Sequence, residues 1–256
     1  MKNLMIYIHP NKGFFDNWGN EAEILVKIQI DNSLELGWKK KDILLVTNFP
    51  YEYRGVKSII LDSYCEFSPT VSKITTIIEM FNKGLIKNEL YWFHDLDAFQ
   101  LQPIKEKEIG YSDFAFTNYG ITTINEGRNH RPSTGVIFFD YNSKDIFELI
   151  LWKAGQYSCN EEVALLELIK QNKKGIRDRI KVLNVSYNYA TRRRDLVKSY
   201  EIAEKPLKVI HFHPFDKRPV AQGVDNISAC MYGKNGMNKI LMTDSLINIF
   251  NKHGIC

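Results

Sequence analysis

The order of structure-forming segments in about the first hundred residues places the strongest constraint on how this chain can fold. Short apolar runs that suit buried strands alternate with longer segments in which apolar residues recur at helical spacing. The expected strands cover residues 4–8, 42–47 and 56–61 and the run that leads into Asp95, and the expected helices cover residues 18–36 and 69–81. This β-α-β-β-α-β order is typical of an α/β fold with a mostly parallel central sheet flanked by helices.

The rest of the chain shows the same elements in a less regular order. Expected strands cover residues 114–118, 136–140, 181–185 and 207–212, and expected helices cover residues 144–154, 161–170 and 239–252. The long polar segments 119–132 and 187–206 are expected to be loop-rich lids or substrate walls. A chain of 256 residues can form one large α/β domain or two small ones, and the lack of any linker favours a single domain over residues 1–256.

Composition narrows the class of protein. Hydrophobic content of 44% and charged content of 25% are ordinary for a soluble globular protein. The net charge of +4 suits a ligand that carries phosphate but is too small to predict a nucleic-acid partner. We therefore expect a small anionic ligand and no nucleic acid.

The cysteines and the apolar runs predict the compartment. The four cysteines are far apart and form no Cys-x-x-Cys pair, which is typical of reduced thiols in a cytosolic protein. The apolar run near Met1 is too short for the core of a signal peptide, and no run approaches the length of a transmembrane segment. The expected location is cytoplasmic, without a transmembrane segment.

Two aspartates follow the aromatic and aliphatic run that ends at His94. Asp95 and Asp97 are spaced i, i+2, so an extended backbone points both side chains to the same face at the end of a buried strand. Two carboxylates placed side by side repel each other unless a cation lies between them. Their hard oxygens suit Mg²⁺ or Mn²⁺, so the sequence predicts a metal site that receives a nucleotide diphosphate. The alternative is a turn in which an aspartate caps the next segment.

A second strand end carries a pair of histidines followed by two cations. His211 and His213 are spaced i, i+2 at the end of the expected strand and would point to one face, and Lys217 and Arg218 come next. Neutral imidazole is a good ligand for Mn²⁺, and a nearby cation can offset the charge of a departing diphosphate. Spacing alone leaves open which histidine binds the metal.

Three further positions are candidates for binding or chemistry. The stretch from Ser133 to Gly135 precedes a buried strand, and the glycine would let a bulky ligand approach the backbone, although an ordinary turn explains it equally well. Glu161 and Glu162 could supply a general base, but Ser158 and Glu161 also fit a capping box at a helix start. Asp62, at the end of the third expected strand, could accept a hydrogen bond from a base or ribose.

In this order the motifs resemble the GT-A class of nucleotide-sugar glycosyltransferases. The stretch 95–97 looks like the Asp-x-Asp metal motif of that class. Three later stretches are similar to the family-eight, glycogenin-like branch: 133–140 to its Asn-Ser-Gly-Val strand, 160–165 to its Asp-Gln-Asp helix start, and 211–219 to its His-x-x-Gly-x-x-Lys-Pro-Trp motif. The chain departs from this branch where Pro214 replaces glycine, where Arg218-Pro219 replaces Pro-Trp, and where Glu161 and Glu162 replace the Asp-Gln-Asp pattern.

The resemblance implies a GT-A fold and a metal-dependent transfer of a sugar from a nucleoside-diphosphate sugar to an acceptor hydroxyl. Residues 1–100 would bind the nucleotide and residues 101–256 the acceptor. Asp95, Asp97 and a histidine would hold Mn²⁺ or Mg²⁺, and Lys217 would contact the diphosphate. Glu161 or Glu162 would take the acceptor's proton in an inverting enzyme, and would position the sugar or acceptor in a retaining one.

Two other functions remain as alternatives. A sugar-phosphate nucleotidyltransferase is expected to carry a glycine-rich basic loop after the first strand, whereas residues 9–15 contain one glycine and one lysine. A non-catalytic nucleotide- or carbohydrate-binding protein of the same fold would bind its ligand without turnover.

Overall fold

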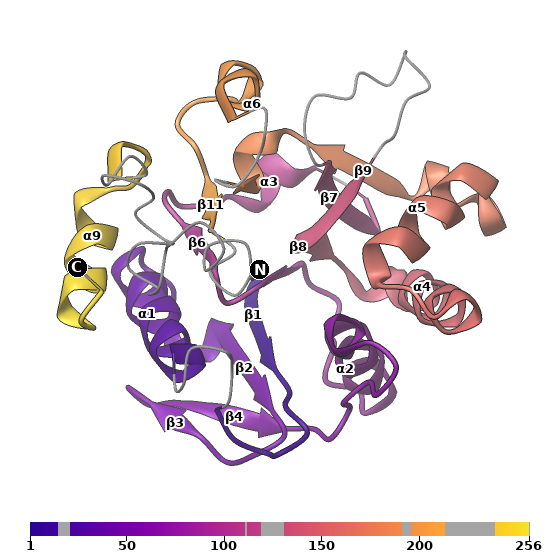
Figure 1. Cartoon of the computed structure of the whole chain (residues 1–256), viewed down its shortest axis with the longest axis horizontal. Coiled ribbons are helices and arrows are strands. Elements are labelled where there is room, and N and C mark those ends of the chain that lie inside the picture. Colours follow the sequence, from indigo (N-terminus) through magenta and orange to yellow (C-terminus); the bar gives the residue numbers. More distant parts are fainter. Residues whose placement is uncertain (15–20, 111, 119–130, 191–195, 213–238, 256) are drawn as a thin grey trace, which may run out of the picture.

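The computed structural model describes residues 1–14, 21–110, 112–118, 131–190, 196–212 and 239–255. A mixed eight-stranded sheet runs through the middle of the molecule (Figure 1), in the order β3-β4-β2-β1-β5-β8-β7-β9. Its strands are β1 (Lys2–Tyr7), β2 (Ile43–Thr47), β3 (Glu52–Tyr53), β4 (Val56–Ile60), β5 (Tyr91–His94), β7 (Phe114–Asn118), β8 (Pro132–Phe139) and β9 (Ile180–Leu183).

Four strands of the N-terminal half, β1, β2, β4 and β5, pair in parallel, as the alternating order of segments predicted, whereas β3 runs antiparallel to β4. Strand β1 lies between β2 and β5, and β4 pairs with the far side of β2. From β1 the chain passes to β2 and β4 on one side and then to β5 on the other, so the strand order reverses between β1 and β5. Ligands of open α/β sheets bind beside the carboxyl ends of the strands at such a reversal. Asp95 follows β5 at this position.

Strand β8 runs antiparallel to both of its neighbours, β5 and β7, and separates the parallel part of the sheet from the parallel pair β7 and β9. All four residues of β5 and all eight of β8 are buried. On one face they pack in a core that includes Phe147, and on the other face in a core that includes Val209. The pairing of His94 with Val136 aligns the end of β5 with the start of β8. The segment after β5 therefore lies beside residues 133–135.

Helices cover the two faces of the sheet as separate groups (Figure 1). They are α1 (Glu21–Glu35), α2 (Ser72–Asn82), α4 (Lys144–Tyr157), α5 (Glu161–Gln171) and α9 (Asp244–Lys252). Leu4 of β1 faces a core shared with α2, α4 and α5, whereas the next residue, Met5, faces a core shared with α1 and α9. Successive side chains of a strand point to opposite faces, which is why Leu4 and Met5 belong to different cores.

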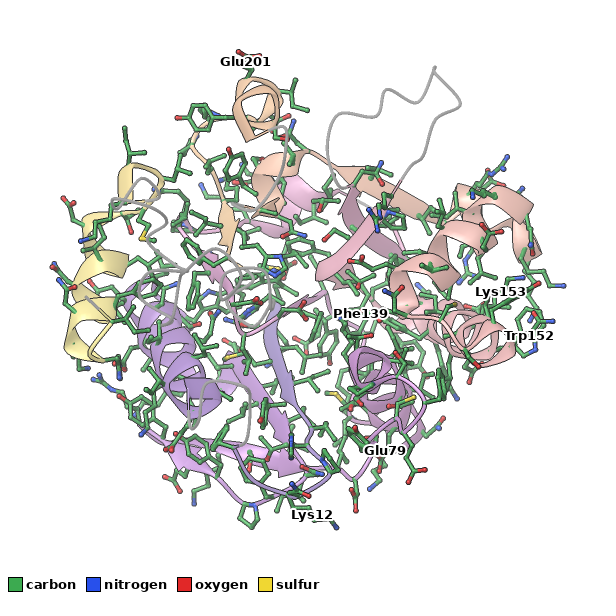
Figure 2. All side chains as sticks on the ribbon, in the orientation of Figure 1. Lys12, Glu79, Phe139, Trp152, Lys153 and Glu201 are labelled. Atoms are coloured by element: carbon green, nitrogen blue, oxygen red, sulfur yellow. The ribbon has the colours of Figure 1, made fainter. Side chains whose placement is uncertain are left out.

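Aromatic side chains fill the core on the α2–α4 side. Phe139 of β8 is fully buried, and its ring lies 6.2 Å from that of Phe81 and 5.0 Å from that of Phe147. Figure 2 shows Phe139 inside the molecule, whereas Trp152 of α4 lies at its surface. Large buried rings of this kind remove much apolar area from water and dominate the stability of a core.

A smaller three-stranded sheet lies next to the end of β5. It has the order β10-β11-β6, with β6 (Ala98–Gln100), β10 (Tyr189–Ala190) and β11 (Val209–His211). β11 runs antiparallel to β6, and His211 pairs with Ala98. This register brings the end of β11 to the residue that follows Asp97.

Some boundaries differ from the sequence-based expectation. The helix expected over residues 239–252 begins only at Asp244, because the Thr243 side chain accepts a hydrogen bond from the Leu246 N–H and caps it. The segment 187–206 is not all loop, since it contains β10 and α6 (Leu196–Ile202). The short helix α3 (Glu106–Ile109) was not predicted either. Residues 119–130 of the other expected loop lie outside the described residues.

The described part of the chain contains no helix long and apolar enough to span a membrane. Among the described cysteines, Cys65 and Cys159 are both free thiols. Cys230 and Cys256 lie outside the described residues.

Candidate functional site

The Asp95–Asp97 segment forms a turn that connects the large sheet to the small one. The N–H of Asp95 donates to the carbonyl of Gly135 at 2.8 Å, which joins the turn to β8. The N–H of Ala98 donates to the carbonyl of Asp95 at 3.0 Å and closes the turn, and the N–H of Phe212 donates to the carbonyl of Asp97 at 3.1 Å. The backbone of the motif is therefore held from both sheets, which fixes where the two carboxylates point.

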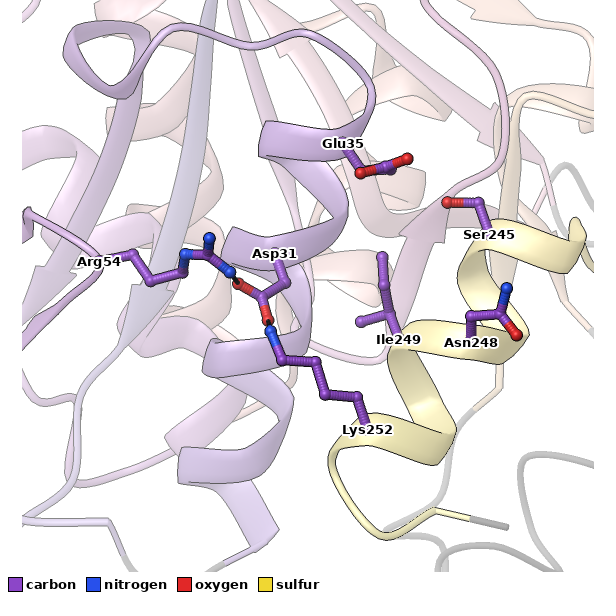
Figure 3. A pocket seen from close by; sticks show the side chains of 7 residues that line it. All are labelled: Asp31, Glu35, Arg54, Ser245, Asn248, Ile249 and Lys252. Carbon is purple, nitrogen blue, oxygen red and sulfur yellow. Dashed lines mark hydrogen bonds and ion pairs between the residues drawn. The ribbon is translucent and has the colours of Figure 1, made fainter.

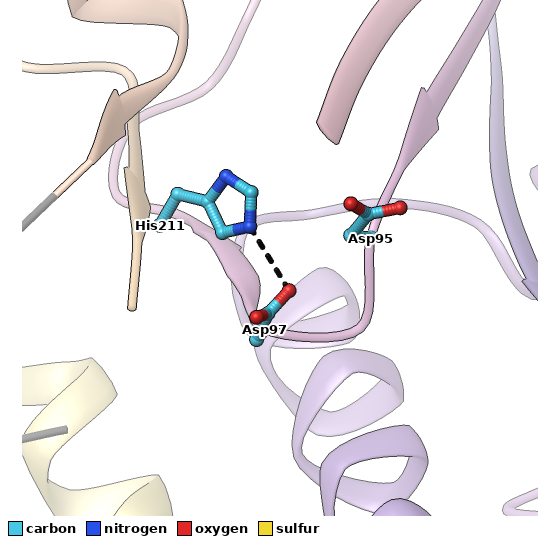
Figure 4. A group of neighbouring side chains, drawn as sticks. All are labelled: Asp95, Asp97 and His211. Atoms are coloured by element: carbon cyan, nitrogen blue, oxygen red, sulfur yellow. Dashed lines mark hydrogen bonds and ion pairs between the residues drawn. The ribbon is translucent and has the colours of Figure 1, made fainter. Parts of the chain in front are cut away.

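The two aspartates and His211 converge in space (Figure 4). Ligand atoms of Asp95, Asp97 and His211 all lie within 4.8 Å of one another. Asp97 and His211 are buried, whereas the side chain of Asp95 is 33% exposed. The turn in the chain, rather than a straight strand, brings the carboxylates together.

The chemistry of these three residues fits a divalent cation. Burial raises the pKa of Asp95, and the neighbouring Asp97 carboxylate raises it further, although Lys73 opposes both effects. A cation bound between the carboxylates would favour their ionised forms. Two carboxylate oxygens and one imidazole nitrogen are ligands that suit Mn²⁺, and the carboxylates alone suit Mg²⁺.

Of the two histidines, the structure places His211 beside the aspartates. Its Nε2 lies 3.1 Å from Oδ1 of Asp97, and its Nδ1 lies 3.0 Å from Oδ1 of Asn188. Burial alone would lower the pKa of His211, but the charge of Asp97 and the hydrogen bond to it raise the pKa overall. His213, Lys217 and Arg218 lie outside the described residues.

Gly135 is required by the close approach of the His211 ring. A Cβ at this position would lie 2.3 Å from Cε1 and 2.8 Å from Nδ1 of His211, and 3.1 Å from Oδ2 of Asp95. The sequence suggested that this glycine lets a ligand approach, and the structure shows that a side chain of the site itself occupies the space. Ser133, expected at a ligand, is fully buried, and its Oγ accepts a hydrogen bond from Asn188.

Lys73 of α2 joins Asp95 to the start of α5. Its Nζ lies 3.0 Å from Oδ1 of Asp95 and 3.1 Å from Oε1 of Glu161, and it donates to the carbonyl of Thr134 at 3.3 Å. Burial by itself would lower the pKa of Lys73, but the charges of Asp95 and Glu161 raise it. Lys73 therefore remains a cation and offsets part of the charge of the carboxylates around it.

Glu161 and Glu162 both reach Thr134 from the first turn of α5. The Thr134 hydroxyl donates to Oε1 of Glu161 at 2.9 Å, and the Thr134 N–H donates to Oε1 of Glu162 at 3.1 Å. Burial of Glu161 would raise its pKa, yet the ammonium of Lys73 and a hydrogen bond from Thr70 together lower it below the ordinary value. Glu161 is thus ionised and paired, while its Oε2 is buried with no hydrogen-bond partner among the described residues.

The expected capping box at this helix is wrong. Asn160 is the N-cap of α5, and its side chain accepts from the N–H of Val163 at 3.0 Å. Ser158 instead ends α4 in the left-handed conformation, with φ 49°. Because Asn160 caps α5, the side chain of Glu161 is not needed for the cap and points toward Lys73.

Asp62 lies near the end of β4 and pairs with a residue from the loop after β1. Its Oδ2 is 2.8 Å from Nζ of Lys12, and both side chains are exposed. The hydrogen bond from Lys12 lowers the pKa of Asp62. This pair joins the two loops at the carboxyl ends of their strands.

A pocket between α1 and α9 lies apart from these residues (Figure 3). It is lined by Asp31, Glu35, Arg54, Ser245, Asn248, Ile249 and Lys252. The buried carboxylate of Asp31 is 2.9 Å from Nη1 of Arg54, 2.7 Å from Nζ of Lys252 and 3.0 Å from Nε2 of His253. These ion pairs hold the C-terminal helix against α1.

Sequence reasoning missed Lys73, Thr134 and Asn188 as members of the site. Lys73 sits in an amphipathic helix and looks there like an ordinary surface residue. Its position between two carboxylates depends on the packing of α2 next to the end of β5 and the start of α5, which the sequence does not reveal. Thr134 did lie inside a motif singled out from the sequence, between Ser133 and Gly135.

Comparison with known protein families finds no matching model, and comparison with curated proteins finds no match. Solved structures do match. The chain is similar to galactosyltransferase LgtC, solved in complex with donor and acceptor sugar analogs, with 14% identity and a TM-score of 0.55 over 90% of this chain and 95% of that one. It is also similar to a glycosyltransferase involved in the glycosylation of the major capsid of PBCV-1, with 14% identity and a TM-score of 0.52 over 88% and 98% of the two chains.

A third match is the glycosyltransferase GlyE of Streptococcus pneumoniae TIGR4, with 10% identity and a TM-score of 0.52 over 94% of this chain and 65% of that one. At such low identity these likenesses concern the arrangement of the backbone. They confirm the fold that the resemblance implied: the chain has the α/β fold of GT-A glycosyltransferases.

Proposed function

We propose that this protein is a glycosyltransferase that moves a sugar from a nucleoside-diphosphate sugar to an acceptor hydroxyl and depends on Mn²⁺ or Mg²⁺. The observation that carries this proposal is the convergence of Asp95, Asp97 and His211 directly after β5. That position is where the strand order reverses, in a fold shared with glycosyltransferases. A triad of this kind suits a cation that receives a diphosphate.

The cation would be held by the two carboxylates and the imidazole, and when bound it offsets the negative charge of the departing diphosphate. Lys217 and Arg218 are proposed to add positive charge at the same diphosphate. Asp62 is proposed to face the nucleoside. Ser133 and Gly135 are proposed to support the site through His211, because Oγ of Ser133 accepts a hydrogen bond from Asn188 and the Cβ position of Gly135 lies against the His211 ring.

Lys73, Glu161 and Glu162 are proposed to face the transferred sugar. The pKa of Glu161 is lowered and its carboxylate is paired with Lys73, so it is a weak proton acceptor and suits a positioning role. Glu162 accepts a hydrogen bond from the Thr134 N–H and is proposed to take the acceptor's proton in an inverting transfer. In a retaining transfer both would orient the sugar.

Two more detailed proposals concern the family branch and the division of the chain. We propose membership of the family-eight, glycogenin-like branch on the stretches 133–140, 160–165 and 211–219. We also propose that residues 1–256 act as one domain, in which residues 1–100 bind the nucleotide and residues 101–256 bind the acceptor. The site lies at the border of the two halves, because Asp97 belongs to one and His211 to the other.

The test is a thermal-unfolding screen of nucleoside diphosphates and nucleotide sugars, with and without Mn²⁺. A ligand that binds only the folded state raises the unfolding midpoint by mass action. We expect one base to stabilise the wild type only when Mn²⁺ is present, and Asp97→Asn to lose that response. Glu148→Gln, which removes an exposed carboxylate from α4, should keep it.

Product analysis then separates the remaining functions. A glycosyltransferase releases a nucleoside diphosphate from the nucleotide sugar, at least slowly to water when no acceptor is present. Release of pyrophosphate from a nucleoside triphosphate and a sugar phosphate would identify a nucleotidyltransferase instead. Metal-dependent binding without any turnover would identify a binding protein, and a response that Asp97→Asn retains would contradict the metal assignment.

A further inference from the structure

The ring of His211 is held by neighbours that reach it from two other elements of the fold. Nδ1 of His211 lies 3.0 Å from Oδ1 of Asn188, and Nδ2 of Asn188 donates to Oγ of Ser133 at 2.9 Å. Ser133 and Asn188 are fully buried, and His211 is 1% exposed. The three side chains form a buried chain of hydrogen bonds that runs from β8 to β11.

The direction of these hydrogen bonds determines which nitrogen of the His211 ring carries a proton. An amide that donates from Nδ2 to Ser133 presents its oxygen to His211, and an oxygen can only accept. Nδ1 of His211 must therefore be the donor. The other ring nitrogen, Nε2, then faces Asp97: without a cation it donates its own proton to that carboxylate, and a bound cation would take the place of this proton.

Gly135 completes the slot that holds the ring. Its missing Cβ leaves room for Cε1 and Nδ1 of His211, which a methyl group would displace. The ring is therefore restrained in position by Gly135 and in orientation by Asn188. A histidine that binds a metal usually donates its second N–H to an oxygen in this way, which fixes the tautomer and the direction of the lone pair.

We infer that Asn188, held by Ser133, is a positioning residue: it keeps the proton of His211 on Nδ1 and so aims Nε2 at the cation site of Asp95 and Asp97. This inference rests on the proposed metal dependence of the site. Asn188 touches neither the cation nor the substrate and acts only through His211.

The first test is the protonation of the ring itself, which needs no metal. NMR of metal-free protein with ¹⁵N-labelled histidine, with His211 assigned from the spectrum of His211→Gln, reports which ring nitrogens bear a proton. The spectra are taken at alkaline pH, where the ring has lost one of its two protons. We expect Nδ1 of His211 to be protonated in the wild type and in Asn188→Asp, whose carboxylate still accepts. In Asn188→Leu we expect that proton signal to be lost. A bare Nδ1 in the wild type would overturn the inference.

The second test is Mn²⁺ affinity, measured by electron paramagnetic resonance of the free ion. Asn188→Leu should weaken binding about 10- to 100-fold, the usual effect of losing such a supporting partner, while Asn188→Asp should stay within about threefold of the wild type. Asn32→Leu is the matched control, because it also removes a buried amide, one that donates to the carbonyl of Gln100 at 2.9 Å. It should leave the affinity unchanged.

The outcomes separate this inference from the proposed function. Weak Mn²⁺ binding that is the same in the wild type, Asp97→Asn and His211→Gln would contradict the metal site itself. If those two variants lose affinity but Asn188→Leu does not, the metal site stands and the role of Asn188 is wrong. Thermal unfolding of each variant identifies any that fail to fold, and rescue by Asn188→Asp distinguishes positioning from general stability.

Discussion

The ammonium of Lys73 lies 3.0 Å from the carboxylate of Asp95, so α2 contributes a cation directly to the turn that carries the two aspartates. The same ammonium binds Glu161. Lys73 is thus shared between a candidate metal ligand and a candidate catalytic carboxylate. A change at Lys73 must affect both.

We expect Lys73→Met to lower the free energy of unfolding by about 3 kcal/mol, because it leaves the buried Glu161 carboxylate without its cation. Mn²⁺ should restore part of this loss, since a bound cation would again offset the charge of Asp95. Urea unfolding with and without Mn²⁺ measures both effects. Lys153→Met is the matched control: this buried lysine of α4 hydrogen-bonds Gln171 and lies 4.4 Å from the ring centre of Tyr157. Its loss should cost less, and Mn²⁺ should not restore it.

Gly135→Ala should disrupt the site from within the sheet. Its Cβ would meet the His211 ring at 2.3 Å, so the ring must move out of its slot, at a cost of about 1–3 kcal/mol for overpacking. We expect Mn²⁺ affinity to fall at least about tenfold, in line with the loss of ligand orientation. Gly155→Ala on α4 is the control, because nothing lies within 4 Å of its Cβ position. It should raise stability by about 0.5–1 kcal/mol, as expected for alanine in a helix. Equal Mn²⁺ affinity in the two variants would refute this account of Gly135.

Glu161→Gln and Glu162→Gln should have different effects. Glu161→Gln removes the charge that Lys73 pairs with and should cost about 1–3 kcal/mol of stability. Glu162→Gln keeps an oxygen for the Thr134 N–H and should leave stability within about 0.5 kcal/mol. If Glu162 takes the acceptor's proton, turnover should fall about 100-fold or more. Transfer at the wild-type rate in Glu162→Gln would exclude it as the base.

The ion pairs that Asp31 forms with Arg54, Lys252 and His253 predict that the stability of the protein depends on pH. Burial raises the pKa of Asp31, but its hydrogen bonds from Lys252, His253 and Arg54 together lower it below the ordinary value of 3.8. A carboxyl with a lowered folded pKa stabilises the protein above its unfolded pKa and loses that effect as the pH falls through the folded value. Asp31→Asn should therefore cost about 1–2 kcal/mol at pH 7 and progressively less below about pH 4.

Urea unfolding of the wild type and Asp31→Asn at several pH values measures this difference. Glu35→Gln, which removes a carboxylate from the lining of the same pocket, is the comparison and should change stability less. If the difference in free energy of unfolding between the wild type and Asp31→Asn stays constant down to about pH 3, the ion pairs contribute little.

Much of the fold could be predicted because its N-terminal half follows local patterns. Apolar runs and helical spacing located β1, β2, β4, α1 and α2 to within a few residues. The antiparallel direction of β8 could not be predicted, since it depends on which strand β5 pairs with after the chain has crossed the sheet. The strands β6 and β10 are only three and two residues long, too short to show a period.

Some residues of the candidate site could likewise be predicted from the sequence, and others could not. Asp95 and Asp97 were predictable because a buried strand that ends in two carboxylates is unusual in itself. His211 was one of two possible ligands, and the structure places it beside Asp97 through the pairing of β11 with β6. Lys73 and Asn188 could not be found from sequence, because neither lies in a recognisable motif and each belongs to the site only through its contact with a side chain of another element.

The turn at Asp95–Asp97 is held by β8 on one side and by the residue after β11 on the other. Asp97 and His211 are separated by 114 positions in the chain. During synthesis the aspartates leave the ribosome long before the imidazole does, and a domain folds as a unit only once its distant contacts can form. For that interval the chain carries two carboxylates and no completed site, so a cation that needs all three side chains would bind only at the end of folding.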